Sequence, residues 1–218
     1  MWDSGPLAVY GSAVTAGSTT TLNPASIFEC VLSNGNLTAT HDAIQDNWAC
    51  AFSTTTSTTG KKYCEVVTTV GDSNNGFIGV ADAAFVAAMS GGTNLGGNTG
   101  GNRKSVGYGY NGAVQIEGSN LTGSPIQGQV LNHIVAVAVD FSAKLIWYKD
   151  LTAGSNWNNT GGADPATGTG GLDISQLTNS PFSFAVGPGF DHTSGANYTV
   201  NFGGSAYTGS VPSGFSNW

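Results

Sequence analysis

The sequence predicts an all-β protein that folds as a sandwich of antiparallel strands. Short runs of β-branched and aromatic residues alternate along the 218 residues with clusters of Gly, Asn, Ser and Asp, which favour turns. Helical periodicity is nearly absent; the one candidate helix is 81–89, with Asp82 placed to cap its N-terminus. A chain of this length suits one domain, because β-sandwiches commonly reach roughly 200–250 residues.

Candidate strands recur between segments rich in Gly, Asn and Thr. The strand candidates are 27–33, 61–70, 76–80, 133–140, 144–149, 182–186 and 197–203. We expect the second and third of these runs to form a hairpin, because GDSNNG between them is a cluster of turn formers. The long polar segments at 90–104, 119–128, 150–173 and 187–196 are expected to be loops. Loops longer than ~12–15 residues in a compact domain are usually functional or disordered, so function is expected there.

The clearest hairpin joins 133–140 to 144–149. The middle of the first run is apolar at every position, which is typical of a strand covered on both faces near the centre of a sandwich. In the second run, the period of two places Trp147 and Tyr148 on opposite faces. At least one of these two rings must therefore lie in the core.

The charge pattern excludes whole classes of partner. Only 9% of residues are charged, against roughly 25% in ordinary soluble domains, and the formal net charge is −7. A nucleic-acid-binding protein needs a basic stripe, which six basic residues do not supply. The N-terminus has no basic region followed by an apolar run, and no stretch approaches ~20 apolar residues. We therefore expect no nucleic acid, no signal peptide and no membrane span.

The sequence has three cysteines, Cys30, Cys50 and Cys64, and an odd number cannot all pair within one chain. Their spacing has no zinc-site pattern, and free cysteines are among the most buried residue types. We expect three buried thiols, with one disulfide between Cys50 and Cys64 as the alternative.

Gly107, Gly109 and Gly112 match the spacing G-x-G-x-x-G of a dinucleotide-binding loop. That motif requires a helix after its last glycine, so that the pyrophosphate lies at the helix N-terminus. Here AVQIEG follows, in which apolar and polar residues alternate with a period of two. The segment therefore predicts strand, turn, strand, and no nucleotide or other cofactor is expected.

Several of these segments, taken in order, resemble the SPRY domain. GKKYCEV at 60–66 is similar to a G-K-x-Y-x-E-V strand of that family, and IGV at 78–80 to its next strand. GYGY at 107–110, the hairpin at 133–150 and VNFG at 200–203 resemble later SPRY strands. The resemblance implies a concanavalin A-like antiparallel β-sandwich with long Gly/Asn/Thr-rich loops, which binds through loops at one edge and is not an enzyme.

Two further segments narrow this resemblance. GADPATGTGGLDIS at 162–175 and the ending at 201–218 are similar to SPRY-like modules of tailed-bacteriophage and prophage structural proteins. The resemblance covers 27–218, which we take as the SPRY-like domain. Residues 1–26 are expected to form an N-terminal arm for docking or homo-oligomerisation, through Trp2 and Tyr10. The implied location is a virion or the extracellular space.

No catalytic or metal motif stands out in the sequence. There is no G-x-S-x-G, P-loop or H-E-x-x-H pattern, and GDSNNG lacks the distant glutamate of a calcium loop. A glycosidase would need two carboxylates ~5–10 Å apart, and a sandwich could in principle bring Glu65 and Glu117 of two predicted strands together, but no strand carries an E-x-D or D-x-E doublet. We therefore expect no enzyme, no catalytic residue and no metal.

The candidate binding residues lie in the expected loops and hairpin tips. They are Tyr110, Asn111, Trp157, Asn158, Phe190, Asp191 and His192. A ring beside asparagines offers a flat apolar face with paired donors and acceptors. Two alternatives stay open for Trp157, which either binds a ligand or anchors its own loop, and the Asp-His pair is either a solvated pair or part of a binding rim.

The sequence thus favours a non-enzymatic binding or structural module of a phage-type virion, such as a tail, fibre or capsid-surface protein. Its partners would be other virion proteins or a host-surface protein or glycan. The alternative is a free-standing or cell-surface carbohydrate-binding module.

Overall fold

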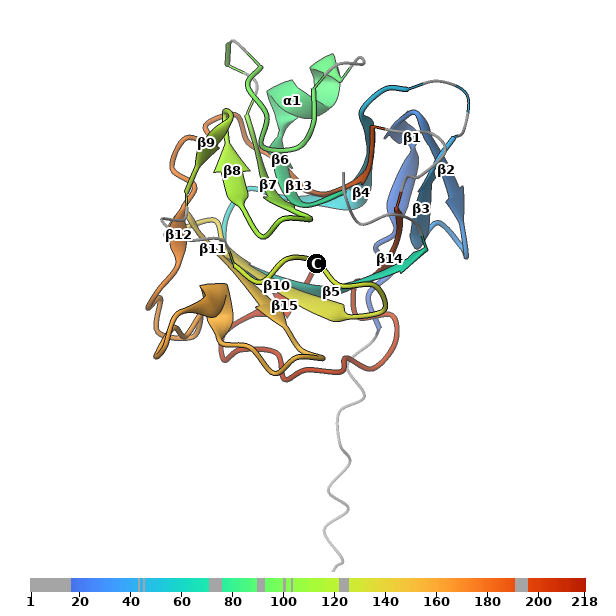
Figure 1. The fold of residues 1–218 in the computed structure, drawn as a ribbon. Helices are drawn as coiled ribbons and strands as arrows, with labels where there is room; N and C mark the ends of the chain where they lie inside the picture. Colours follow the sequence, from blue (N-terminus) through green and yellow to red (C-terminus); the bar gives the residue numbers. More distant parts are fainter. Residues whose placement is uncertain are drawn as a thin grey trace, which may run out of the picture.

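Two antiparallel sheets face each other in the computed structural model (Figure 1). The structure describes residues 17–42, 44, 46–70, 76–89, 93–99, 101–102, 104–121, 126–190 and 196–218. Within these residues, one sheet has seven strands and the other has eight. The two-sheet sandwich expected from the sequence is confirmed.

The seven-stranded sheet, at the top of Figure 1, runs in the order β1-β4-β13-β6-β7-β8-β9. Its strands are β1 (Leu22–Phe28), β4 (Ala49–Ser57), β13 (Phe182–Gly189), β6 (Phe77–Asp82), β7 (Ser105–Gly109), β8 (Val114–Ile116) and β9 (Ser119–Asn120). Helix α1 (Ala83–Ala88) lies on its outer side. There Phe85 of α1 packs with Phe52 and Phe77 of the sheet.

The eight-stranded sheet runs in the order β12-β11-β10-β5-β14-β3-β2. Its strands are β12 (Leu172–Asp173), β11 (Leu145–Asp150), β10 (Ile134–Asp140), β5 (Lys61–Val70), β14 (Asn197–Asn201), β3 (Thr38–His41) and β2 (Cys30–Ser33). Its eighth strand, β15 (Ser216–Asn217), is off this path and pairs with β5 in parallel. The last strand of the chain thus returns to the sheet.

The main core lies between the sheets. Alternate residues of β10, namely Val135, Val137 and Val139, enter it together with rings such as Tyr148 and Phe184. Burying each large apolar side chain stabilises the fold by roughly 1.5–3 kcal/mol. The strict alternation of core residues along β10 reflects the two-residue period of a strand.

The outer face of the eight-stranded sheet carries a second cluster, which covers the other side of β10. Ala136 and Ala138 pack there with Tyr63 and Trp147. The segments beneath the sheet in Figure 1 cover this cluster, and they contribute Leu151, Trp157, Tyr207 and Phe215. The prediction that both faces of β10 are covered is confirmed, as is the separation of Trp147 and Tyr148.

The hairpin predictions had different outcomes. β10 and β11 form the expected antiparallel pair, with Val137 opposite Tyr148. The strand–turn–strand unit at the glycine motif is also confirmed, because β7 pairs with β8. The hairpin expected from 61–70 and 76–80 is wrong: β5 pairs with β10 and β14 in one sheet, whereas β6 pairs with β7 and β13 in the other. The chain crosses between the sheets there.

The single strand expected at 27–33 is also wrong. β1 and β2 belong to different sheets, and the chain changes sheet at Glu29, which has a positive φ of 49°. Strand β4 lies in a Thr- and Ser-rich stretch that the sequence analysis did not assign. Its first five residues, Ala49–Ser53, are buried, whereas the following threonines 54–56 are exposed, so the mostly apolar part of the strand faces the interior.

The short helix and the free thiols agree with the sequence. Asp82 caps α1 by accepting a hydrogen bond from the Phe85 amide at 2.9 Å. Cys30, Cys50 and Cys64 are all free and buried, so the alternative disulfide is wrong. Burial raises the pKa of each of these thiols.

The start of the sandwich lies inside the expected arm of 1–26. β1 begins at Leu22, and the Thr20 hydroxyl donates to the carbonyl of Trp218 at 2.8 Å. The described chain is therefore tied to its own C-terminus before the expected boundary. Trp2 and Tyr10 lie outside the described residues.

Candidate binding surface at the loop end

One end of the sandwich collects loops from both sheets. In the seven-stranded sheet, β4 begins where β13 ends, with Ala49 opposite Gly189, and β6 begins opposite Gly109, the last residue of β7. In the eight-stranded sheet, β10 begins where β11 ends, with Val135 opposite Asp150. We call this end of the molecule the loop end.

Gln129 shows that these strand ends belong to one surface. Its side-chain amide donates to the Tyr108 carbonyl at 2.7 Å and to the Gly76 carbonyl at 3.4 Å, both at the end of the seven-stranded sheet. Its side-chain oxygen accepts a hydrogen bond from the Tyr198 hydroxyl at 2.7 Å, on β14 of the other sheet. The buried amide therefore joins the two sheets.

Aromatic rings line one side of the loop end. The ring of Trp48, half-buried before β4, lies 5.7 Å from that of Phe77 and 5.4 Å from that of Phe190. Such tilted and edge-on pairs stabilise one another by about 0.5–1.5 kcal/mol beyond their burial. Phe190 is nevertheless 39% exposed, so an apolar ring held in place by Trp48 faces solvent.

Tyr110 and Asn111 form the hairpin tip beside these rings. The Tyr110 amide donates to the Gly76 carbonyl at 3.1 Å, directly before Phe77, and its carbonyl accepts from the Gln129 amide at 2.9 Å. Tyr110 is half-buried, whereas Asn111 is exposed. The Asn111 side chain holds the turn by accepting from the Ala113 amide.

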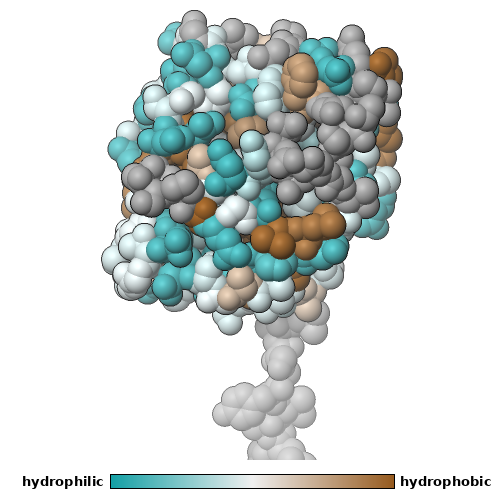
Figure 2. Space-filling view, in the orientation of Figure 1, coloured by the Kyte–Doolittle hydropathy of each residue, from teal (hydrophilic) through white to brown (hydrophobic). Residues whose placement is uncertain are grey.

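Val130 and Leu131 extend the apolar surface from Gln129 into the turn before β10. They are 39% and 44% exposed, so two neighbouring aliphatic side chains face solvent here. We call Trp48, Tyr110, Val130, Leu131 and Phe190 the loop-end strip, because contacts through Gln129, Gly76 and Phe77 connect them. Figure 2 shows the face seen in Figure 1, where small brown patches lie among pale and teal residues.

The buried acid Asp150, at the end of β11, contacts the residue that directly precedes β10. The Asp150 carboxylate lies 2.7 Å from His133 Nδ1 and also accepts from the Ala153 amide at 2.9 Å. Burial, with a smaller contribution from Asp150, raises the pKa of the Tyr108 phenol. Tyr108 therefore stays a neutral donor, and its hydroxyl donates to the Gln127 carbonyl.

The other expected site residues do not join the loop-end strip. Asp191 and His192 lie outside the described residues, next to Phe190 in the sequence. Trp157 is half-buried against the outer cluster, with Lys149 Nζ 5.9 Å from its ring centre. The buried Asn158 amide donates to the carbonyls of Ile146 and Gly170, so these two side chains hold their own loop.

Glu65 and Glu117 do not face each other across a cleft. Glu65 lies on the outer face of β5, where it accepts from the amides of Thr208 and Gly209 at 2.9 and 2.8 Å. Glu117 follows β8 of the other sheet and pairs with Lys104 at 3.0 Å. In the part of the chain that is described, no group of three His, Cys, Asp or Glu side chains could hold a metal ion. No helix there is long and apolar enough to cross a membrane.

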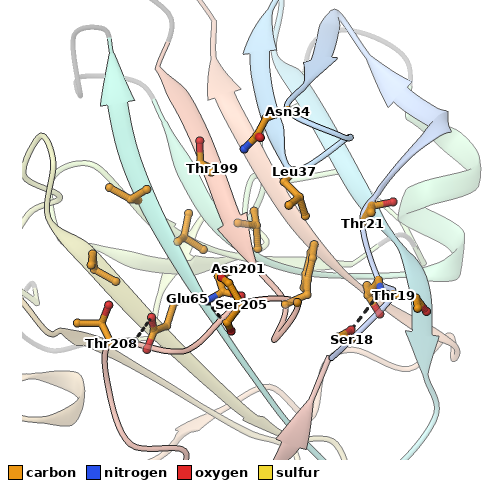
Figure 3. Close-up of a pocket in the computed structure, with 17 residues that line it drawn as sticks. Ser18, Thr19, Thr21, Asn34, Leu37, Glu65, Thr199, Asn201, Ser205 and Thr208 are labelled. Atoms are coloured by element: carbon orange, nitrogen blue, oxygen red, sulfur yellow. Dashed lines mark hydrogen bonds between the residues drawn. The ribbon is translucent and has the colours of Figure 1, made fainter. Parts of the chain in front are cut away.

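A second concave feature lies away from the loop end, on the outer face of the eight-stranded sheet (Figure 3). It is a pocket of about 460 Å³ over β5 and β14. Val67 and Ile134 of the sheet line it together with Leu37, and residues 18–21 border it with Gly204, Ser205 and Thr208. Sequence reasoning missed this pocket, because the residues that line it come from distant segments.

Comparisons with solved structures show the same fold in SPRY domains. The SPRY domain of human HERC1 matches with a TM-score of 0.59 at 12% identity, over 83% of this chain and 96% of that one. The TRIM65 PSpry domain matches with a TM-score of 0.53 at 13% identity, over 84% and 90%. The chain has the SPRY fold. It is a concanavalin A-like sandwich; no protein-family model and no curated protein matches the sequence.

The sequence predictions include Tyr110 and Phe190 of the loop-end strip but not Trp48, Val130 or Leu131, and the binding role of all five stays a prediction. Trp48 is not among the predicted residues, because the Thr- and Ser-rich sequence after it does not mark the strand that it precedes. Val130 and Leu131 form an aliphatic pair between polar segments and directly precede Asn132. Such a pair beside a turn is the signal that could have marked them as exposed.

Proposed function

We propose that this chain is a non-enzymatic binding module whose loop-end strip docks a protein partner. The observation that carries the proposal is the exposure of Val130, Leu131 and Phe190 on a rigid frame formed by Trp48 and Gln129. Exposed apolar groups on a preorganised surface are typical of protein-binding sites.

Aliphatic side chains favour a protein over a glycan at this surface. A sugar stacks on the flat face of a ring and needs polar groups around it, whereas Val130 and Leu131 offer neither. Trp157, whose ring would have to be exposed to stack on a glycan in the carbohydrate-binding alternative, packs against the outer cluster. Asn111, with Asp191 and His192, would supply the polar rim of the protein-binding surface.

The biological setting we propose is a phage-type virion, in which the partner is another virion protein or a host-surface protein. This part of the proposal is supported by the resemblance of 162–175 and 201–218 to modules of tailed-phage structural proteins. The low charge of the chain, in which 9% of residues are charged, suits docking through apolar and hydrogen-bonding contacts rather than electrostatic steering.

The test measures binding to proteins encoded by neighbouring genes, each produced singly and probed by biolayer interferometry. We expect Leu131→Asp and Phe190→Asp to weaken binding at least tenfold, as for interface anchors. The matched control is Val211→Asp, at an exposed valine on the C-terminal segment. A partner that binds the loop-end variants as tightly as wild type would overturn the proposal. Glycan-array binding that Trp157→Ala removes would favour the carbohydrate-binding alternative.

A further inference from the structure

The outer face of the eight-stranded sheet is covered over only part of its width. On β5, β10 and β11 the C-terminal segment lies across the face, and Tyr207 and Phe215 pack against the outer cluster. On β5 and β14 the pocket shown in Figure 3 remains, with Val67, Ile134 and Thr199 half-buried. The same sheet therefore has a covered part and an open part.

The pocket is suited to an uncharged peptide. Val67, Ile134 and Leu37 provide apolar contacts, while Thr199 and Asn34 offer polar atoms at the rim. Its one acid, Glu65, already accepts hydrogen bonds from Tyr63, Thr208 and Gly209. An occupant therefore needs apolar side chains and a backbone that can bond to hydroxyl and amide groups, but no counter-charge.

The described chain starts at the rim of this pocket. Gly17 is its first residue, the Ser18 amide donates to the Gly203 carbonyl at 3.1 Å, and residues 18–21 line the pocket. Residues 1–16 precede this point and lie outside the described residues. Their sequence, MWDSGPLAVYGSAVTA, has one charged side chain, Asp3, and carries the apolar residues Trp2, Leu7, Val9 and Tyr10.

We propose that residues 1–16 fold back over this pocket of their own chain and seat the ring of Tyr10 on Val67. Tyr10 precedes Gly17 by seven residues, which extend up to ~23 Å at ~3.3 Å each, enough to cross the face of two or three strands. A segment tethered at the rim has an effective concentration in the millimolar range, so its own pocket is favoured over that of a second copy. The N-terminal segment then covers the open part of the sheet as the C-terminal segment covers the rest.

Disulfide trapping in the full-length chain tests this contact. Ser12→Cys, two residues from Tyr10, is combined with Thr199→Cys, which lies opposite Val67 on the neighbouring strand, and disulfide formation is followed on non-reducing gels; the native thiols are buried and do not compete. We expect a rapid intramolecular bond. The rate should fall at least roughly tenfold when Val67→Asp is added, because an ionised carboxylate on the floor opposes apolar burial. Chain length is unchanged in that variant, so reach alone cannot explain the slowing.

Tyr10→Ser provides a second substitution, outside the sandwich, in case Val67→Asp disturbs folding. This substitution should also lower the rate of disulfide formation. Leu131→Asp, in the loop-end strip, should leave trapping unchanged, which separates this proposal from the proposed function. If the disulfide forms as fast in both the Val67→Asp and the Tyr10→Ser variants as in the chain without them, the inference is overturned. A disulfide that joins two chains would also overturn it.

Discussion

The hydroxyl of Tyr198 donates to Gln129 Oε1 at 2.7 Å, and this bond ties β14 of one sheet to the loop end of the other. The amide group of the same side chain donates to the carbonyls of Tyr108 and Gly76. One buried side chain thus satisfies a hydroxyl and two carbonyls from three segments. Rigidity at the loop end depends on this arrangement.

Gln129→Leu should destabilise the protein strongly. The substitution keeps the shape but leaves a buried hydroxyl and two carbonyls without their partner, which costs about 2–4 kcal/mol in total. For a chain of this size the midpoint of thermal unfolding should fall by roughly 5–15 °C. The matched control is Gln115→Leu, because the Gln115 amide makes an exposed hydrogen bond to Asn120 and its loss should cost little. Equal midpoints for the two variants would contradict this role.

Glu65 should hold the C-terminal segment on the sheet. Its carboxylate accepts from the Tyr63 hydroxyl and from the amides of Thr208 and Gly209 at 2.8–2.9 Å. Glu65→Gln replaces one acceptor oxygen by a donor that faces a donor, so we expect a loss of about 1.5–3 kcal/mol.

Hydrogen exchange shows where in the structure Glu65→Gln lowers the stability. The amides of Thr208 and Gly209 should exchange faster in Glu65→Gln, whereas those of β10 keep their order of protection. Glu117→Gln is the control, because Glu117 follows β8 of the other sheet, where it pairs with Lys104, whereas both amides donate to Glu65. Unchanged exchange at both amides would show that other contacts hold the segment.

The structure also shows which features a sequence can predict. The β10–β11 hairpin was predictable because a short turn joins two runs whose side-chain pattern requires pairing. The crossing from β5 to β6 was not, because a turn-rich segment fits a hairpin and a change of sheet equally well. The change of sheet at Glu29 has no glycine or proline to mark it.

The residues of the candidate site were also predictable only in part. Tyr110 and Phe190 follow recognisable strands, so their place at a strand end could be inferred from sequence alone. Trp157 lies in an equally polar loop, but that loop folds back on β11, where the Asn158 side-chain oxygen accepts from the Tyr148 amide. Whether a loop projects or folds back depends on such distant contacts, which local sequence does not encode.

Alkaline pH should destabilise the fold from about pH 8.5 upward. Burial raises the pKa of all three thiols and of phenols such as Tyr63 and Tyr198 above their ordinary values. The unfolded chain releases these protons near pH 8.5 for Cys and 10 for Tyr, whereas the folded chain retains them. Stability is therefore full below the unfolded pKa and falls as pH rises.

Urea unfolding at pH 7, 9 and 10.5 measures this decline, and thiol labelling gives an independent check. The buried thiols of the native protein should react with a disulfide reagent only as fast as the protein opens, and all three should react at once in urea. Native thiols that react at the rate of a free cysteine, or stability that stays constant to pH 10.5, would contradict the prediction.

Gly112 should be essential for a steric reason and not for binding a nucleotide. Its φ of 85° is one that other residues rarely adopt, and a Cβ there would lie 1.7 Å from the Ile126 carbonyl oxygen. That carbonyl belongs to a close pair, because the Ile126 amide donates to the Gly112 carbonyl at 2.8 Å. Gly112→Ala must therefore push the 126–133 segment away from the hairpin tip.

We expect Gly112→Ala to cost at least ~2 kcal/mol and to weaken any partner binding through Val130 and Leu131, which follow the displaced backbone. Gly161→Ala is the matched control, since a Cβ at Gly161 meets no atom within 4 Å and its φ is not positive. Thermal unfolding and interferometry on both variants measure the two effects. If Gly112→Ala melts and binds like Gly161→Ala, the glycine spacing of this hairpin is not a packing requirement.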